Sequence, residues 1–240
     1  MTLPRFFTTI FDTTARRGAG VLVLLFLSTV VWELSTWDMP FMAIWGTETG
    51  FEWRHNWWLE TVLHDRARSV MVGVYLLLVV LTAWPVGGFG RVPCWQRWTA
   101  LVGVTLALLA VNWVKRNSGT SCPWDIAAFG GQYPYVSHLN LAVLDGGPGR
   151  CFPGGHASAV LAFWALAPAI WRTPGASPRR GWWVWCVVGG LGLLFGWVQT
   201  VRGAHYPSHT AWTMVICWGV AWLTDGVSNL IRSRVVGRTR

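Results

Sequence analysis

The chain has 240 residues, of which 53% are hydrophobic and only 12% are charged. A soluble domain carries roughly 25% charged residues, so this composition excludes an ordinary soluble globular protein. The net charge of +9 is compatible with a nucleic-acid partner only if the basic residues cluster on one soluble surface, and their distribution along the chain argues against that.

The apolar residues fall into blocks long enough to cross a bilayer, which takes roughly 17–25 residues in a helix. The fourth block is short and contains Pro168, so its ends are the least well defined. The pattern predicts an all-α integral membrane protein with six transmembrane helices in a single domain over residues 1–240. The predicted spans are Ala19–Trp37, Val70–Val86, Trp98–Val114, Ala157–Trp171, Trp182–Val201 and Ala211–Ile231.

The first span follows basic residues, as in a signal peptide, but no small-residue cleavage site comes after it. We therefore expect it to be retained, with residues 1–18 forming a short amphipathic helix on the inner surface. Glu33 lies near the outer end of this span. Its carboxylate is expected to extend toward the membrane interface.

The basic residues are distributed asymmetrically between the two sides of this topology. Twelve of the 19 lie on the segments that are inner if the N-terminus is cytoplasmic. This bias follows the positive-inside rule and predicts that both termini are cytoplasmic, in a bacterial inner membrane. Most of the basic residues are thus explained by the orientation of the chain in the membrane, and we expect no nucleic-acid partner. The oligomeric state stays open. The seven outer basic residues are Arg54, Arg66, Arg68, Lys115, Arg116, Arg150 and Arg202.

The outer segments also hold the titratable chemistry. Phe51–Arg68 predicts an interfacial helix. Glu60, His64 and Asp65 are expected on its solvated face, with capping of the site as the alternative. Residues 115–156 have the repeated Gly and Pro of an irregular loop, and long loops on a scaffold are usually functional. An active site is therefore expected on the outer, periplasmic side. All six histidines lie there: His55, His64, His138, His156, His205 and His209.

Two cysteines, Cys122 and Cys151, share this outer loop. In the oxidising compartment outside a bacterial inner membrane, such a pair favours a disulfide. The bond would tie the chain leaving the third span to the residues just before the fourth.

Three segments that are distant in sequence meet at the outer surface in this topology. Lys115 and Arg116 end the third span, and Arg202 follows the fifth. Cations of this kind suit a phosphoryl group, whose charge lies on its oxygens. Gly154 and Gly155 begin the fourth span, where backbone N–H groups at a helix start favour an anion.

Two histidines accompany these cations, His156 at the start of the fourth span and His205 between the last two. A neutral imidazole can attack phosphorus and form a phosphohistidine. A second, protonated imidazole can donate to the leaving oxygen and later deprotonate water. Both roles suit a group whose pKa lies near neutral pH.

The order and spacing of these residues resemble the type 2 phosphatidic acid phosphatase superfamily, over about residues 98–225. That family carries Lys-x6-Arg-Pro, then Pro-Ser-Gly-His, then Ser-Arg-x5-His-x3-Asp. The resemblance implies six helices with the acid phosphatase/haloperoxidase-like core, His205 as nucleophile, His156 as general acid and Lys115 as phosphate ligand, without a cofactor. The matching segments are Lys115-x6-Cys122-Pro123, Pro153-Gly154-Gly155-His156 and His205-Tyr206-Pro207-Ser208-His209.

The chain departs from the family motifs at four positions. Arg116 and Arg202 are the candidates to supply the positive charge that the substituted arginines no longer provide. Arg202 lies three residues after Gln199, so its long side chain would cover the same site if the helix persists. Cys122 replaces the first arginine, Gly154 the serine, Gln199 the second arginine and His209 the aspartate that orients the nucleophile.

The missing aspartate leaves several replacements open. His209 itself is a candidate catalytic residue, by hydrogen bonding to His205. Asp125, Asp145 and Asp65 are alternatives that would approach from the loops.

Two other classes of function were weighed. His205-x3-His209 with His156 resembles a set of zinc ligands, but Pro207 disfavours a regular helical turn between them and no Glu adjoins either histidine. We therefore expect a metal-independent enzyme. A transporter or a non-catalytic membrane protein is disfavoured because the spans are almost uncharged at their centres.

The expected substrate is a lipid phosphate or diphosphate at the outer leaflet, of the undecaprenyl diphosphate, phosphatidylglycerol phosphate or lipid A type. A lipid-to-lipid phosphotransferase of the same family is the closest alternative, since only the acceptor differs. Resemblance at the level of the fold does not decide between them.

Overall fold

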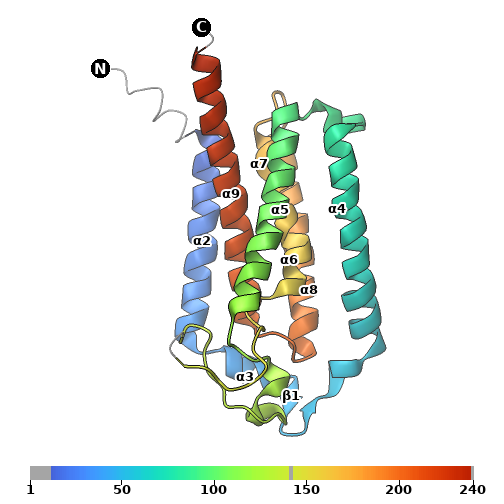
Figure 1. Ribbon diagram of the computed structural model, residues 1–240, viewed down its shortest axis with the longest axis vertical. Coiled ribbons are helices and arrows are strands. Elements are labelled where there is room, and N and C mark those ends of the chain that lie inside the picture. The colour runs from blue at the N-terminus through green and yellow to red at the C-terminus, as the bar shows by residue number, and fades with distance from the viewer. Residues whose placement is uncertain (1–11, 141–142, 239–240) are drawn as a thin grey trace, which may run out of the picture.

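The structure is a computed structural model that describes residues 12–140 and 143–238. Long helices run side by side along one axis, and the short elements and loops gather at one end of the bundle (Figure 1). We call this end the site end. The beginning of α2 and the end of α9 lie at the opposite end.

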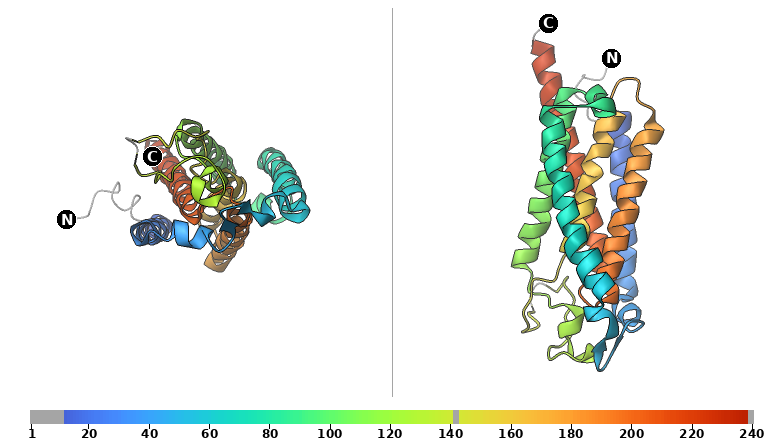
Figure 2. Two further views of the ribbon diagram at one scale, coloured as in Figure 1. Left: turned by 90° about the horizontal axis from the view of Figure 1, so that it is seen from below. Right: turned by 90° about the vertical axis from the view of Figure 1, so that its right-hand side faces the viewer.

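The helices alternate in direction along the chain; the shorter α6–α7 stretch runs back between α5 and α8, so these two long helices point the same way (Figure 2). In the small hairpin, Gly46 pairs with Phe51 and Thr47 with Gly50. The long helices are α2 Thr13–Ser35, α4 Ala67–Ala83, α5 Cys94–Asn117, α8 Pro178–Val201 and α9 Pro207–Arg238. The shorter elements are α3 Asp38–Met42, β1 Gly46–Thr47, β2 Gly50–Phe51, η1 Glu52–His55, η2 Trp58–Arg66, η3 Gly87–Arg91, η4 Pro123–Asp125, η5 Ala127–Phe129, α6 Gly155–Leu161, η6 Ala162–Ala165 and α7 Leu166–Trp171.

Among the described residues, five helical stretches are long and apolar enough to cross a membrane. They correspond to five of the predicted spans, and the remaining one, Gly155–Trp171, is a shorter apolar helix. The prediction of an all-α membrane protein is confirmed, whereas the count of six spans stays a prediction. The five are Thr13–Ser35, Trp58–Ala83, Cys94–Asn117, Pro178–Val201 and Pro207–Val236.

The shorter helix is interrupted, and Pro168 explains where. A proline has no N–H to donate to the carbonyl four residues earlier, and its ring crowds that carbonyl. The chain accordingly tightens into a 3-10 turn over Ala162–Ala165 before α7 begins. The two α-helical pieces nonetheless continue in one direction between α5 and α8 (Figure 1).

The core lies where α5, α6, α8 and α9 meet. Trp164 and Trp218 are fully buried there, and the ring of Trp164 stacks on Trp185 with centroids 5.1 Å apart. The indole N–H of Trp164 donates to the carbonyl of Trp185 at 2.7 Å. Buried indoles need such a partner, so this bond fixes α6 and η6 against α8.

Helix α2 packs along α9 (Figure 1), and small residues allow the close approach. Trp218 donates from its indole nitrogen to the carbonyl of Gly18 at 2.9 Å. A Cβ on Gly18 would lie 2.3 Å from the ring of Trp222. At the end away from the site, Arg172 forms ion pairs with Asp225 of α9 and with Asp12, directly before α2.

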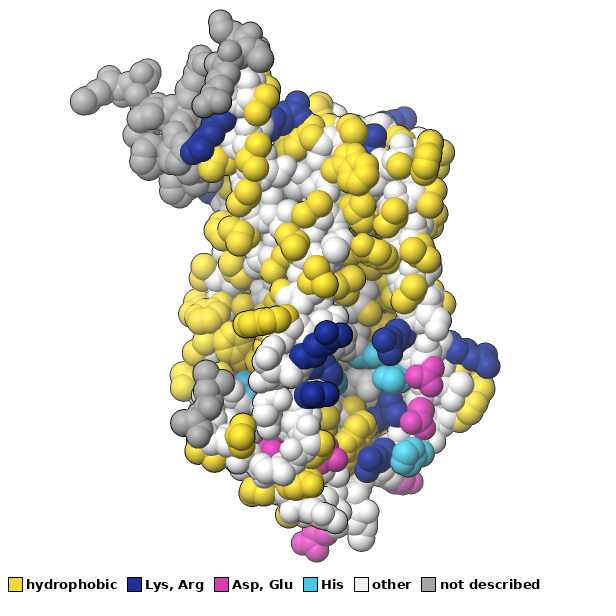
Figure 3. Space-filling model, in the orientation of Figure 1, with side chains coloured by type: hydrophobic (Ala, Val, Ile, Leu, Met, Phe, Trp, Pro, Cys, Tyr) yellow, Lys and Arg dark blue, Asp and Glu magenta, His cyan; other side chains and the backbone are white. Residues whose placement is uncertain are grey.

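The predicted amphipathic helix over residues 1–18 falls largely on residues 1–11, which lie outside the described residues. From Thr13 onward the chain is already part of α2. On the face shown in Figure 3, apolar side chains cover most of the bundle, whereas histidines and acidic residues gather at the site end.

Candidate active site

The turn between α8 and α9 carries His205 and is defined by its backbone. Gly203 has a φ of +76°, its N–H donates to Thr200 at 2.9 Å, and the N–H of Ala204 donates to Gln199 at 2.8 Å. This pair of bonds with a left-handed glycine is the Schellman ending of a helix. Pro207 then begins α9, where a proline loses no hydrogen bond. His205 therefore sits in a short turn with little conformational freedom.

His205 is almost completely buried, with 6% of its surface exposed. Its Nδ1 lies 3.4 Å from Nδ1 of His209 and 3.5 Å from Sγ of Cys151. Burial holds the pKa of His205 well below its usual range, and the nearby charges of Lys115 and His156 act in the same direction. At neutral pH the imidazole is therefore neutral and keeps a lone pair available.

Lys115 lies against the start of α6. A Cβ built on Gly155 would be 3.2 Å from Cδ of Lys115 and 3.5 Å from its Nζ. The glycine thus lets the ammonium group approach the backbone, where a larger residue would push it away. The N–H of Gly154 donates to the carbonyl of His209 at 3.1 Å, so it fastens α6 to α9 and is not free to bind an anion.

His156 is covered by η2. Its Nε2–H donates to the backbone carbonyl of His64 at 3.0 Å. The two rings are stacked, with centroids 4.0 Å apart and planes inclined by 19°. The proton that a general acid would deliver is thus held by η2 in this structure.

Arg202 is also bound to this segment. It is 4% exposed, and its guanidinium donates to the carbonyl of Arg54 at 3.0 Å and to Oε1 of Glu60 at 2.8 Å. A longer contact of 3.4 Å joins it to Oε1 of Gln199, so Arg202 does lie beside the position where the family has an arginine. Arg116, the other candidate, is exposed and has no hydrogen bond or ion pair with any described residue.

The residues from Glu52 to Arg66, which we call the covering segment, thus engage two predicted site residues. The expectation that Glu60 and His64 lie on a solvated face was wrong, because they bind Arg202 and His156. Asp65 fits that expectation better: its side chain is 64% exposed and pairs with His64. The segment contains a π-helix, a rare form that is frequent at functional sites.

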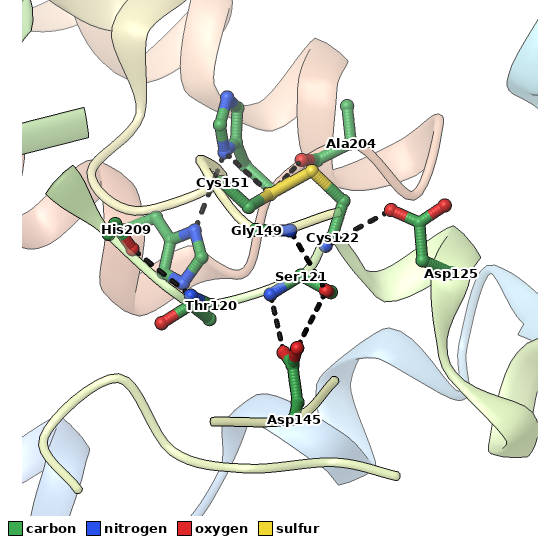
Figure 4. The surroundings of a disulfide bond; sticks show 11 residues. Thr120, Ser121, Cys122, Asp125, Asp145, Gly149, Cys151, Ala204 and His209 are labelled. Atoms are coloured by element: carbon green, nitrogen blue, oxygen red, sulfur yellow. Dashed lines mark hydrogen bonds between the residues drawn. A yellow bond between two sulfur atoms is a disulfide. The ribbon is translucent and has the colours of Figure 1, made fainter. Parts of the chain in front are cut away.

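The predicted Cys122–Cys151 disulfide is confirmed, with Cα atoms 5.2 Å apart. Cys151 is fully buried, and its N–H donates to the carbonyl of Thr120 at 2.9 Å. Figure 4 shows the bond between the two loop strands, close to Ala204 and His209. The cysteine at the family's arginine position is therefore part of a brace beside His205.

The loop aspartates proposed as replacements for the missing carboxylate are engaged elsewhere. Asp145 accepts from the backbone and hydroxyl of Ser121 at 2.6 and 2.9 Å (Figure 4). Asp125 accepts from the N–H of Cys122 at 3.3 Å. Of the alternatives left open, the contact between His209 and His205 is the one that the structure contains.

Glu33 lies close to the outer end of α2, as expected, but its carboxylate is paired and mostly buried. Its carboxylate forms an ion pair with His138 at 2.9 Å and accepts the indole N–H of Trp212 at 2.8 Å. His138 stacks on Phe152, with centroids 4.2 Å apart. A carboxylate in a long apolar stretch is expensive without partners, and this was the signal that could have found Glu33.

Within the described residues, one group of side chains has donor atoms close enough for a metal ion: Cys151, His205 and His209. Cys151 is in the disulfide and offers no thiolate while that bond is intact. His156, the third ligand considered from the sequence, is not in the group. Two imidazoles fall short of the three protein ligands of a catalytic zinc site.

Comparison with protein-family models identifies a family for this chain. The model of the PAP2 superfamily matches residues 96–229. The chain belongs to this superfamily. No curated protein and no solved structure matches the chain. The matched region includes α5 through most of α9, and therefore Lys115, His156 and His205, whereas the covering segment and Glu33 precede it.

Removing the disulfide should loosen the loop without destroying the bundle. The cysteines are 29 residues apart, and closing a loop of that length contributes about 2–4 kcal/mol. We expect Cys122→Ser to lower the thermal unfolding temperature in detergent, and treatment of the wild type with a dithiol to reproduce the shift. Cys94→Ser, at an exposed free cysteine, serves as the control. Equal melting curves for Cys122→Ser and the wild type would contradict the prediction.

Acidification should destabilise the protein through His205. The folded state keeps this group neutral below the ordinary pKa of 6.5, whereas the unfolded chain binds the proton. Above pH 6.5 this group therefore leaves the free energy of unfolding unchanged. Below pH 6.5 the free energy of unfolding falls with pH, by up to about 1.4 kcal/mol per pH unit. In melting curves measured between pH 7 and 5, His205→Gln should show a weaker decline than the wild type. Equal declines of the unfolding temperature in the variant and the wild type would refute the lowered pKa of His205.

Proposed function

We propose that the protein is a metal-independent lipid phosphatase that hydrolyses a lipid phosphate or diphosphate at the outer face of a bacterial inner membrane. The observation that carries the proposal is the neutral, buried His205 beside Lys115 and His156, at one end of an apolar bundle. Membership of the PAP2 superfamily supports the same reaction class.

In the proposed first step, the lone pair of Nε2 of His205 attacks phosphorus. The bond between phosphorus and the lipid oxygen breaks, and this oxygen takes a proton from His156. Burial lowers the pKa of His156 to about 4 in the structure, and the negative charge of a bound phosphate raises it so that His156 carries that proton. Lys115 and Arg202 bind the phosphoryl oxygens, whose charge grows as the leaving group departs. The products of this step are a lipid alcohol, or a lipid monophosphate from a diphosphate, and phosphohistidine 205.

In the second step, water attacks the phosphohistidine and gives a proton to His156, which is now neutral. The phosphorus–nitrogen bond breaks, and its electron pair returns to His205. Inorganic phosphate leaves and both histidines regain their starting protonation states. Nδ1 of His205 keeps its contact with His209 throughout, so His209 holds the ring while Nε2 reacts.

The substrate is proposed to be of the undecaprenyl diphosphate, phosphatidylglycerol phosphate or lipid A type. The exposed tryptophans of the covering segment, Trp53, Trp57 and Trp58, suit the membrane interface. Such an interfacial belt supports a site at the level where a lipid headgroup is presented. Both termini are proposed to be cytoplasmic, because the beginning of α2 and the end of α9 lie opposite the site.

Phosphate release from a panel of these lipids, measured with purified protein in detergent, tests the proposal. The wild type should release phosphate from at least one lipid, and His205→Ala should lose activity by roughly a factor of 10⁴ or more. His156→Ala should fall by about 10²–10⁴. Chelator should have no effect. Wild type without release from any lipid would refute hydrolysis, and transfer of labelled phosphate to an added lipid alcohol would identify the phosphotransferase instead.

The ion pair between Glu60 and Arg202 gives a second prediction. The carboxylate competes with a substrate phosphate for the same guanidinium. Glu60→Gln should therefore lower KM, by about threefold for a half-exposed pair, with little change in kcat. Glu52→Gln, an exposed carboxylate of the same segment, is the matched control. A higher KM in Glu60→Gln would show that Glu60 assists binding.

A further inference from the structure

The backbone of Cys151 is a hydrogen-bond partner of two buried histidines. The rings of His205 and His209 each have a hydrogen bond to it. The N–H of Cys151 is already used, because it donates to the carbonyl of Thr120 at 2.9 Å. The carbonyl oxygen of Cys151 is therefore the acceptor for both rings, which its two lone pairs allow.

A carbonyl oxygen only accepts, so the ring nitrogen that faces it carries a hydrogen. For His209 this nitrogen is Nδ1, since its Nε2 has no hydrogen-bond partner among the residues that the structure describes. For His205 it is also Nδ1, which lies 3.5 Å from Sγ of Cys151 and 3.4 Å from Nδ1 of His209. The lone pair of His205 is thus left on Nε2, the atom that attacks phosphorus in the proposed reaction.

The carbonyl of Cys151 has little freedom to move. Cys151 is fully buried and is bonded through its sulfur to Cys122 (Figure 4). Next to the hydrogen bond from Cys151 to Thr120, the N–H of Arg150 donates to the carbonyl of Ser118 at 2.7 Å. One covalent bond and two backbone hydrogen bonds therefore fix this part of the chain against the loop that leaves α5.

An acceptor at Nδ1 suits an attacking imidazole. The hydrogen bond that one ring nitrogen makes fixes the tautomer of the ring, and a backbone carbonyl often provides it. The family motif has an aspartate at position 209, where this chain has a histidine. A neutral carbonyl orients the ring without burying a further charge, which is costly unless the charge is paired.

We propose that the carbonyl oxygen of Cys151 is a positioning group for His205 and that the Cys122–Cys151 disulfide holds it in place. This carbonyl takes the role of the aspartate in the family motif. The inference rests on the proposed function of His205 as the nucleophile. It assigns the disulfide a part in the reaction in addition to its effect on stability.

Opening the disulfide tests this assignment, because it frees the carbonyl without changing either histidine. We expect Cys122→Ser to lower kcat for phosphate release by roughly 10–100-fold, the usual effect of losing an outer partner of a histidine, with KM unchanged. Treatment of the wild type with a dithiol should reproduce the loss, and reoxidation should restore the activity. Cys94→Ser, at an exposed free cysteine, is the control and should keep the wild-type rate.

A rescue variant separates this role from a general loosening of the loop. His209→Asp returns the carboxylate of the family motif, which can accept the Nδ1–H of His205 whether or not the disulfide is intact. Dithiol treatment should therefore lower kcat of His209→Asp by no more than about twofold. His209→Ala supplies no acceptor, and reduction should lower its kcat by the same factor as in the wild type.

A second readout does not depend on turnover. In protein labelled with nitrogen-15 at its histidines, nuclear magnetic resonance distinguishes ring nitrogens that carry hydrogen from those that do not. The signals of His205 are identified by their loss in His205→Gln. In the oxidised wild type at neutral pH, Nδ1 of His205 should carry the hydrogen and Nε2 should not. After reduction, both tautomers should be populated.

The two failures are distinguishable. If the wild type releases phosphate from no lipid, the proposed function fails, and the resonances still report the tautomer of His205. The inference is overturned if Cys122→Ser keeps kcat within about twofold of the wild type, if reduction costs His209→Asp as much as the wild type, or if Nε2 of His205 carries the hydrogen. If Cys122→Ser does not fold, the dithiol-treated wild type and the resonances decide in its place.

Discussion

The site depends on how the first turns of α9 are held. Two buried carboxylates from the N-terminal part of the chain do this. Asp38 accepts the N–H of Ser208 at 3.1 Å and also its hydroxyl, across 170 positions of sequence, and Glu33 accepts from Trp212. Burial raises the pKa of Asp38, and its hydrogen bonds from Ser208 and Trp32 oppose that shift. Because a buried carboxylate is costly without such partners, α3 and the end of α2 cannot move away from α9 independently. The position of His209, between Ser208 and Trp212, follows from this constraint.

This dependence changes the meaning of the substituted motif positions. Where the family has an arginine the chain has Gln199, and Arg202 lies in contact with it from the end of the same helix. Where the family has another arginine the chain has Cys122, which is bonded to Cys151 next to His205. In the first case a cation remains beside the substituted position, and in the second the cysteine braces the loop. The supports come partly from residues before position 96, where the family match begins.

The sequence predicted local features, such as the helices, but not the contacts between side chains that are far apart in the chain. The length of an apolar block is visible in the sequence, so the five long helices were found. Cys122 and Cys151 were paired because the predicted topology puts them in one outer loop. Glu60 with Arg202 joins residues 142 positions apart, and nothing near either residue indicates the other. His138 lies in an irregular loop without any periodicity. Glu33 carried a signal, as an acidic residue in an apolar span, but one that a snorkelling side chain also explains.

To bind at the site, a substrate must replace hydrogen bonds that the covering segment makes to His156 and Arg202. In the structure a carbonyl oxygen of His64 accepts from His156, and a carboxylate oxygen of Glu60 accepts from Arg202. Both are oxygen acceptors at groups that would bind phosphate oxygens, and a phosphate must replace them. The net affinity is therefore the difference between two sets of hydrogen bonds, and a dianion exceeds a carbonyl and a single carboxylate in charge. Headgroups without that charge gain nothing from the exchange, so the same contacts that close the site also select for phosphate.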